Sequence, residues 1–129
     1  MKLSVVIPAH NEEGSIAETL QHLHAVLRRE SIAHEIVVVN DHSADGTGAV
    51  LAGLQAAMPE LREVVNDGPG GYGHAVRKGL ASFTGDCVAV MMADLSDDPE
   101  DLVRFYRKME EGHDCVFGTR WSKGGRVVD

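Results

Sequence analysis

The sequence lacks several features that would each mark a particular class of protein. It has only two cysteines, and because Cys87 and Cys115 each stand in an apolar run we expect buried thiols rather than a disulfide. No apolar run approaches the roughly 20 residues of a membrane-spanning helix, and the N-terminus is too short and too soon polar for a secretory signal. Twelve Lys and Arg against twenty Asp and Glu give a net charge of −8, which argues against non-specific nucleic-acid binding. We therefore expect a cytoplasmic protein with no nucleic-acid partner.

What is present fits an ordinary globular domain. Hydrophobic residues make up 43% of the chain and charged residues 25%, the usual balance for a domain with a packed core. A length of 129 residues predicts one domain rather than two. The chain ends shortly after its last apolar run with no closing helix, so we expect a domain truncated at its C-terminus.

Apolar runs alternate regularly with helical patterns. Short runs rich in Val predict buried strands at 3–7, 36–39, 61–65, 87–92 and 115–117. Amphipathic stretches predict helices around 16–27, 50–58, 72–83 and 102–109. Strands that are apolar on both faces and joined by helices are typical of a mostly parallel sheet covered on both sides. The sequence therefore predicts a Rossmann-like, doubly wound α/β fold.

In such folds ligands bind at the carboxyl ends of the strands. The segments after the predicted strands are all polar, glycine-rich or acidic: 8–13, 40–46, 66–73, 93–99 and 118–125. Any one of them is ordinary for a turn. Five of them at one edge of the sheet favour a binding site there.

Two of these segments carry acidic residues with competing interpretations. Asp94 comes too early to cap the following helix, and a carboxylate there suits Mg²⁺ or Mn²⁺ bridging to a diphosphate. Asp97 and Asp98 are better explained as helix caps. Asp41 is assigned to ligand binding, as an acceptor for a ribose hydroxyl or a base N–H, and Asp45 to capping.

The run from Gly68 to Gly73 matches the pattern G-x-G-x-x-G, which leaves an NAD-dependent oxidoreductase open as an alternative. That fingerprint belongs in the first βα turn, and Pro69 removes a backbone donor from this one. A glycine-rich turn that lets a substrate approach the backbone closely explains the run better.

The seven histidines do not predict a metal cluster. Four lie within a predicted helix or before a predicted strand and are expected to be structural: His22, His24, His34 and His113. The other three lie on the predicted ligand edge: His10, His42 and His74. That these three meet in space is the less favoured alternative.

Taken together, several motifs resemble the inverting family 2 glycosyltransferases, which have the GT-A nucleotide-sugar fold. The matching segments are VIPAHNE at 6–12, EIVVVNDHSADGT at 35–47, GYGHAVRKG at 71–79, ADLSDDPE at 93–100 and GTRW at 118–121. The resemblance is strongest to the dolichyl- and polyprenyl-phosphate sugar synthases. It implies that residues 1–129 are the N-terminal, nucleotide-sugar-binding part of such a domain.

The resemblance also implies roles for individual residues. In the family the first turn holds the base and ribose, and here it contains Pro8, Ala9, His10, Asn11 and Glu12. Asp41 matches an aspartate that contacts the base or ribose, and Gly73 lies in the loop that closes on the nucleotide. Asp94 matches the second carboxylate of the metal-binding D-x-D motif, and Arg120 matches an arginine near the acceptor phosphate.

The implied reaction transfers a sugar, mannose from GDP-mannose in the first instance, to a polyprenyl or dolichyl phosphate with inversion. Such an acceptor would place the protein at the cytoplasmic face of a membrane. The D-x-D motif reads Met92-Ala93-Asp94 here, and because a thioether is a poor ligand for Mg²⁺ or Mn²⁺ the metal affinity should fall. Asn40 and His42 also depart from the family pattern. Two alternatives stay open: a UDP-sugar with a polysaccharide acceptor, and a non-catalytic nucleotide-sugar-binding domain.

Overall fold

The computed structural model describes residues 1–112, 117–119 and 126–128. Four parallel strands form the main sheet: β1 (Leu3–Ala9), β2 (His34–Asn40), β3 (Leu61–Val65) and β4 (Cys87–Val90). Four helices connect or follow them: α1 (Ile16–Arg29), α2 (Thr47–Gln55), α3 (Tyr72–Leu80) and α4 (Pro99–Glu110). Within these residues no helix has the length and apolar character needed to cross a membrane.

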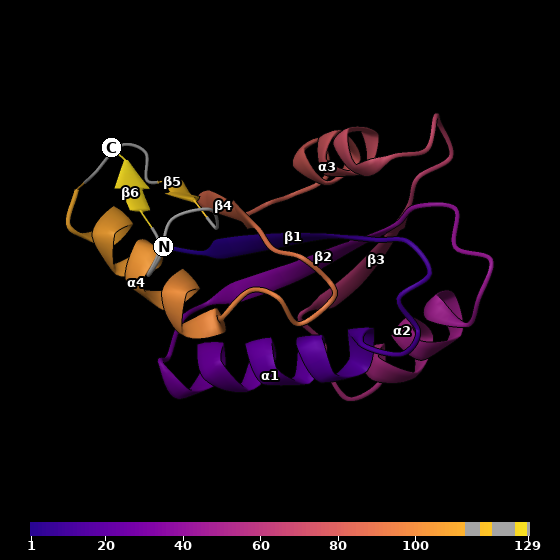
Figure 1. The fold of residues 1–129 in the computed structure, drawn as a ribbon. Coiled ribbons are helices and arrows are strands. Elements are labelled where there is room, and N and C mark those ends of the chain that lie inside the picture. The colour runs from indigo at the N-terminus through magenta and orange to yellow at the C-terminus, as the bar shows by residue number, and fades with distance from the viewer. Residues whose placement is uncertain (113–116, 120–125, 129) are drawn as a thin grey trace.

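Helices cover both faces of the sheet, as Figure 1 shows, with α1 and α2 on one side and α3 on the other. The larger core lies between the sheet and α1, α2 and α4, and it includes Val5, Leu20 and Leu102. A smaller core lies under α3, where Ala75 packs with Val6 of β1 and with Val37 and Val39 of β2. The predicted doubly wound α/β fold is confirmed.

The strand order is β3-β2-β1-β4, so the chain moves outward from β1 to β3 and then returns to the other side of β1. The register places Ala9 beside Asn40, and Asn40 beside Val65. Three strands therefore end level with one another at the carboxyl edge. Pro8 is tolerated inside central β1 because the ladder to β4 ends at Val6, on the side where its missing N–H would point.

The predicted strand at 115–117 is the main point of difference. The structure has β5 (Phe117–Thr119) paired antiparallel with β6 (Arg126–Val128) in a separate two-stranded sheet. The fifth predicted strand therefore does not extend the described part of the parallel sheet. The prediction for Cys87, a buried free thiol, is confirmed, whereas Cys115 and His113 lie outside the described residues.

Candidate functional site at the carboxyl edge of the sheet

The level ends of β1, β2 and β3 bring their next residues into one row. His10, Asp41 and Asn66 each directly follow a strand. The Nδ1 of His10 lies 2.6 Å from the backbone oxygen of Asp41, and since a carbonyl only accepts, this nitrogen carries the proton. The side-chain amide of Asn66 donates to Asp41 Oδ1 at 2.9 Å. Three loops are thus tied together at the site that sequence analysis predicted.

Asp41 holds the glycine-rich loop in place. Its Oδ2 accepts a hydrogen bond of 2.9 Å from the N–H of Gly71, and the side chain of Asn66 also donates to the carbonyl of Pro69. Asp41 is only 5% exposed. Burial works to raise the pKa of its carboxyl, but the hydrogen bonds from Asn66 and Gly71 and the nearby His42 and His10 lower it overall. The carboxylate is therefore an ionised anchor for the loop that forms one wall of the site.

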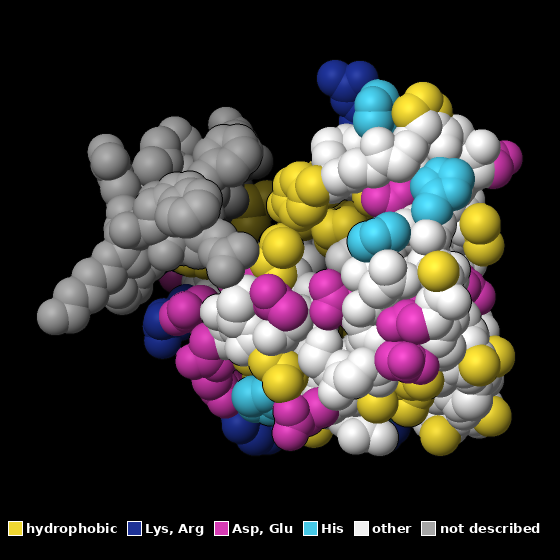
Figure 2. Space-filling view, turned by 45° about the vertical axis from the view of Figure 1, so that its right-hand side comes forward, with side chains coloured by type: hydrophobic (Ala, Val, Ile, Leu, Met, Phe, Trp, Pro, Cys, Tyr) yellow, Lys and Arg dark blue, Asp and Glu magenta, His cyan; other side chains and the backbone are white. Residues whose placement is uncertain are grey.

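A cleft of about 530 Å³ opens beside this anchor. Its lining combines backbone of the glycine loop with imidazole and phenol rings: His10, Asp41, His42, Gly68, Gly70, Gly71 and Tyr72. Histidine and acidic side chains gather on the face in Figure 2 toward which these loops project. None of the cleft-lining residues in the described part of the chain is a Lys or Arg. A phosphate bound here would need a cation from another source.

Backbone conformations with positive φ occur in every loop at this edge. Asn11 after β1, His42 after β2 and Leu95 after β4 have φ of 53°, 54° and 68°. Gly71 after β3 has φ of 123°. Non-glycine residues seldom adopt such angles, and they tend to cluster at functional sites. Three of the four described non-glycine residues with positive φ thus lie at this edge, and the fourth, Ser31, lies at the opposite one.

The first loop is fastened to the second by its own backbone and side chains. Asn11 receives a hydrogen bond from the N–H of Ala44 at 2.7 Å and donates its N–H to Ser43 at 3.0 Å. The N–H of Glu12 donates to the hydroxyl of Thr47 at 2.9 Å. Asp45 accepts from the N–H of Thr47 at 3.0 Å in a turn that leads into α2, but the N-cap of that helix is Gly46, so Asp45 is not the capping residue that the sequence predicted.

The loop after β4 carries the predicted metal ligand. Asp94 is exposed, and its Oδ1 accepts from the N–H of Ser96 at 3.1 Å. Asp97 is engaged by the N–H of Met92 at 2.7 Å, and Asp98 caps α4 through the N–H of Glu100, as predicted for one of this pair. In the described residues no group of three potential ligands forms at this edge. The donors fit a divalent cation held by Asp94 and by the oxygens of a bound diphosphate.

Apart from Asp94, the predicted site residues fall into four groups. His10, Asn11, Glu12 and Asp41 meet at the edge as described above, while Pro8 and Ala9 are buried in β1 rather than in the turn. Gly73 lies in the first turn of α3, not in the loop, because the helix begins directly after Gly71. Arg120 lies outside the described residues.

Several residues at this site are not among those predicted from the sequence. These are Gly70 and Tyr72, which line the cleft, and Asn66, which supports it; His42 was expected only as one of three histidines that could meet here and as a departure from the family pattern. The signal for Asn66 was present, since it directly follows a strand as Asp41 does. Of the three histidines considered together, His10 and His42 line the cleft and His74 does not. The His42 Nε2–H donates to the carbonyl of Gly68 at 2.7 Å, so this ring braces the loop.

A polar cleft at the carboxyl edge of a parallel sheet is typical of ligand-binding α/β domains. The family model described as glycosyl transferase family 2 matches residues 4–128, and the chain belongs to that family. It is 33% identical over 127 residues to a dolichol-phosphate mannosyltransferase from Pyrococcus furiosus, covering 98% of this chain and 35% of the relative.

Two solved structures place the fold among the GT-A glycosyltransferases. A mannosyltransferase from Pyrobaculum calidifontis, in complex with GDP-Man and Mn²⁺, gives a TM-score of 0.71 at 26% identity, over 90% of this chain and 34% of that one. A glucosyl-3-phosphoglycerate synthase from Mycobacterium tuberculosis, in complex with UDP, gives 0.68 at 25% identity, over 87% and 41%. The chain thus spans about a third of the curated relative's length. The first of these neighbours holds a nucleotide sugar and a divalent metal ion, and the second holds a nucleoside diphosphate.

Proposed function

We propose that residues 1–129 form the N-terminal, nucleotide-sugar-binding part of a glycosyltransferase that passes a sugar to a lipid phosphate with inversion. The observation that carries the proposal is the cleft formed where Asp41 and Asn66 anchor the glycine loop. Exposed Tyr72 and the two imidazoles offer flat surfaces for a nucleobase, and base–aromatic stacking contributes about 1–3 kcal/mol per base. The side-chain oxygens of Asp41 and Tyr72 and the backbone of the glycine loop are groups that can form hydrogen bonds with ribose hydroxyls and base N–H groups.

We place the diphosphate of the donor near Asp94. Because no Lys or Arg lines the cleft in the described residues, charge on the leaving group needs a cation, and we assign that cation to Asp94, an exposed carboxylate in the loop after β4. When bound, Mg²⁺ or Mn²⁺ would neutralise the developing charge on the diphosphate. Met92 supplies no hard oxygen ligand, so we expect the metal to be held weakly until the nucleotide is present.

The acceptor is assigned as a polyprenyl or dolichyl phosphate, in line with the name of the Pyrococcus relative. A phosphate is already an anion at neutral pH, so its oxygen can attack the anomeric carbon without a strong general base. The new C–O bond forms as the bond to the diphosphate breaks, and the electron pair leaves with the nucleotide. Positioning and charge neutralisation then supply the catalysis. Arg120 is our candidate for the acceptor phosphate, and the lipid would bring the protein to the cytoplasmic face of a membrane.

A second donor class has its own support. The Mycobacterium neighbour is in complex with UDP, and the described residues that line the cleft do not distinguish guanine from uracil. A UDP-sugar with another acceptor, and a domain that binds the nucleotide without transfer, are therefore the competing outcomes of the test below.

The test is calorimetric binding of GDP, UDP, GDP-mannose and UDP-glucose, each with Mn²⁺ and with EDTA. We expect tighter binding with Mn²⁺, an Asp94→Asn variant that loses only this metal-dependent gain, and a Met92→Asp variant that increases it. Asp101→Asn on α4 is the matched control and should change nothing. Equal losses for Asp94→Asn in Mn²⁺ and EDTA would contradict the metal assignment.

Transfer is tested separately with dolichyl phosphate as acceptor on the full-length protein. Formation of the lipid-linked sugar from GDP-mannose is the expected result. Transfer from a UDP-sugar would correct the donor, and nucleotide binding without any product would favour the non-catalytic alternative.

A further inference from the structure

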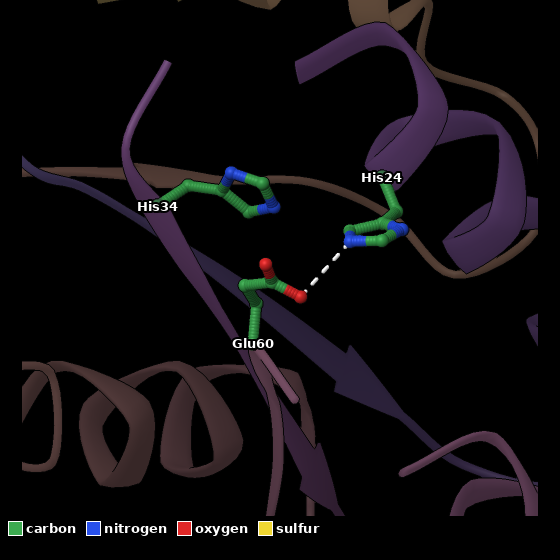
Figure 3. A group of neighbouring side chains, drawn as sticks. All are labelled: His24, His34 and Glu60. Carbon is green, nitrogen blue, oxygen red and sulfur yellow. Dashed lines mark hydrogen bonds and ion pairs between the residues drawn. The ribbon is translucent and has the colours of Figure 1, made fainter. Parts of the chain in front are cut away.

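A second group of ligand-type side chains lies at the opposite, amino-terminal edge of the sheet. His24 comes from the second half of α1, His34 begins β2, and Glu60 directly precedes β3. Figure 3 shows the three side chains pointing toward one another. One potential ligand atom from each lies within 4.8 Å of the other two. Three elements far apart in sequence thus present two imidazoles and a carboxylate to one small volume.

The His34 ring is oriented as a metal-binding imidazole would be. Its Nδ1 lies 2.8 Å from the carbonyl oxygen of Ile32 and must donate to it. The proton is therefore on Nδ1, and the lone pair is on Nε2. That Nε2 is buried without a hydrogen-bond partner, an unusual state for a polar atom inside a protein. Metal-ligating histidines commonly fix their tautomer through such a bond from the other nitrogen to a carbonyl.

His24 and Glu60 would complete the donor set once the proton that His24 Nε2 donates to Glu60 has moved to Nδ1 or to solvent. The Nε2 of His24 lies 2.9 Å from Glu60 Oε1, and their side chains are 13% and 31% exposed. The His24 and His34 rings meet edge to face with their centroids 5.5 Å apart. The group is therefore shielded from solvent on the His34 side and open on the Glu60 side. With neutral imidazoles the three side chains carry one negative charge, which attracts a cation.

We propose that His24, His34 and Glu60 bind a divalent transition-metal ion of the Zn²⁺ type. Two nitrogens and one carboxylate oxygen form a recognised zinc donor set, with a water in the fourth position. Ligand bonds of about 2.0–2.1 Å put neighbouring ligand atoms roughly 3.3 Å apart in a tetrahedral site. Since no two of the three ligand atoms are more than 4.8 Å apart, the side chains would have to draw in by at most about 1.5 Å.

This site is chemically distinct from the one proposed at Asp94. Imidazole donors favour Zn²⁺, Cu²⁺ or Ni²⁺, whereas Mg²⁺ and Mn²⁺ favour carboxylate, carbonyl and phosphate oxygens. An ion here would link α1 to the N-terminal ends of β2 and β3, so we assign it a structural role. The alternative is a purely hydrogen-bonded cluster with no metal.

The test uses the purified protein without a histidine tag, titrated with ZnCl₂ against a chromogenic chelator. Three variants keep the local hydrogen bonds but remove or weaken one metal ligand. An asparagine amide can replace the Nδ1–H of His34, so we use His34→Asn; by the same logic we use His24→Gln and Glu60→Gln. His22→Gln, on the exposed side of α1, is the matched control.

We expect one Zn²⁺ per chain and a higher melting temperature with Zn²⁺ but not with Mg²⁺. Loss of a group that only orients a metal ligand already weakens metal binding by about tenfold or more. Each histidine variant loses a ligand itself and should therefore weaken Zn²⁺ binding by more than about tenfold. His22→Gln should bind as the parent does. Should a variant fail to fold, the absorption spectrum of the Co²⁺-loaded parent protein still reports whether nitrogen ligands form a four-coordinate site.

Two results would overturn the proposal. One is the absence of stoichiometric Zn²⁺ binding together with an unchanged melting temperature, as the hydrogen-bonded cluster predicts. The other is Zn²⁺ binding that is equally strong in His34→Asn, His24→Gln and the parent, which would place the ion on other histidines.

Discussion

At the scale of single residues, Glu35 is a carboxylate that stays ionised although it is almost completely buried. It is 8% exposed, and its Oε2 accepts hydrogen bonds of 2.6 Å from both the Ser4 hydroxyl and the N–H of Thr84. Burial works to raise the pKa of the Glu35 carboxyl, but these bonds and the one from Arg62 outweigh it and lower the pKa to about 2. The folded protein therefore favours the ionised form strongly.

The pKa of Glu35 predicts how stability depends on acid. Because the folded value lies below the unfolded one, the stabilisation is complete above about pH 4.5 and is lost as the pH falls toward 2. Glu35→Gln should cost on the order of 3 kcal/mol at pH 7. The difference should shrink steadily below pH 4.5 in urea unfolding at several pH values. Exposed Glu18→Gln on α1 serves as control, and a pH-independent difference for Glu35→Gln would contradict the prediction.

Gly71 and Gly73 make a matched pair with opposite expectations. Gly71 has φ of 123° and ψ of 157°, a conformation that belongs almost entirely to glycine and costs other residues about 1–3 kcal/mol. A Cβ would meet no atom within 4 Å at either position, so the backbone alone decides the effect. Gly71→Ala should lower the free energy of unfolding by that amount. Gly73→Ala, inside α3, should raise it by about 0.5–1 kcal/mol.

Unfolding by guanidinium, followed by circular dichroism, checks both substitutions. Nucleotide titration of Gly71→Ala adds a second reading, since its N–H holds the loop to Asp41. A stabilising Gly71→Ala would show that the loop adopts a different conformation in solution.

At the scale of elements, α3 depends on its close approach to the sheet. A Cβ built on Gly79 would collide with Val6 of β1 and would come within 3.1 Å of Val39 on β2. Gly79→Ala should therefore destabilise the protein by about 1–3 kcal/mol through overpacking, although alanine is the better helix former. Gly53→Ala on α2, where a Cβ meets nothing within 4 Å, should stabilise slightly. Equal chemical-denaturation midpoints for the two variants would contradict this account of α3.

The presence of most helices and strands could be predicted from the sequence, whereas the contacts between them could not. The apolar runs and helical periods gave β1 to β4 and α1 to α4, because the patterns are strong and the turns between them are polar. The parallel strands are apolar on both faces, so no alternation of side chains fixes their register. The row of His10, Asp41 and Asn66 follows from that register and was only partly foreseen. The run at 115–117 was too short to reveal its partner strand.

The cluster of His24, His34 and Glu60 at the amino-terminal edge was also not predictable from the sequence. From the sequence, His24 and His34 were expected to be structural, because one lies within a predicted helix and the other directly before a predicted strand. Their approach to Glu60 depends on how α1 packs across β2 and β3, which no local pattern encodes. Side chains from three separate elements are the least predictable part of any site.

At the scale of the whole molecule, one helix connects the two edges of the sheet. Near its start, the Thr19 hydroxyl of α1 donates to the Ala93 carbonyl in the loop before Asp94. His24 follows five residues later, on a different side of the helix. Strand β2 separates the edges as well, because the seven residues from His34 to Asn40 span roughly 20 Å. The two proposed metal sites therefore share a scaffold but lie at opposite edges of the sheet.

This arrangement predicts that the two sites act independently. Binding at well-separated positions with no shared partners adds to within about 0.5 kcal/mol. The stabilisation by GDP with Mn²⁺ should thus be unchanged in His34→Asn, and that by Zn²⁺ unchanged in Asp94→Asn. Thermal unfolding of the parent with each ligand set and with both together checks the sum. A coupling larger than about 1 kcal/mol would mean that α1 shifts when either site fills, so that a metal at the amino edge would regulate nucleotide binding at the carboxyl edge.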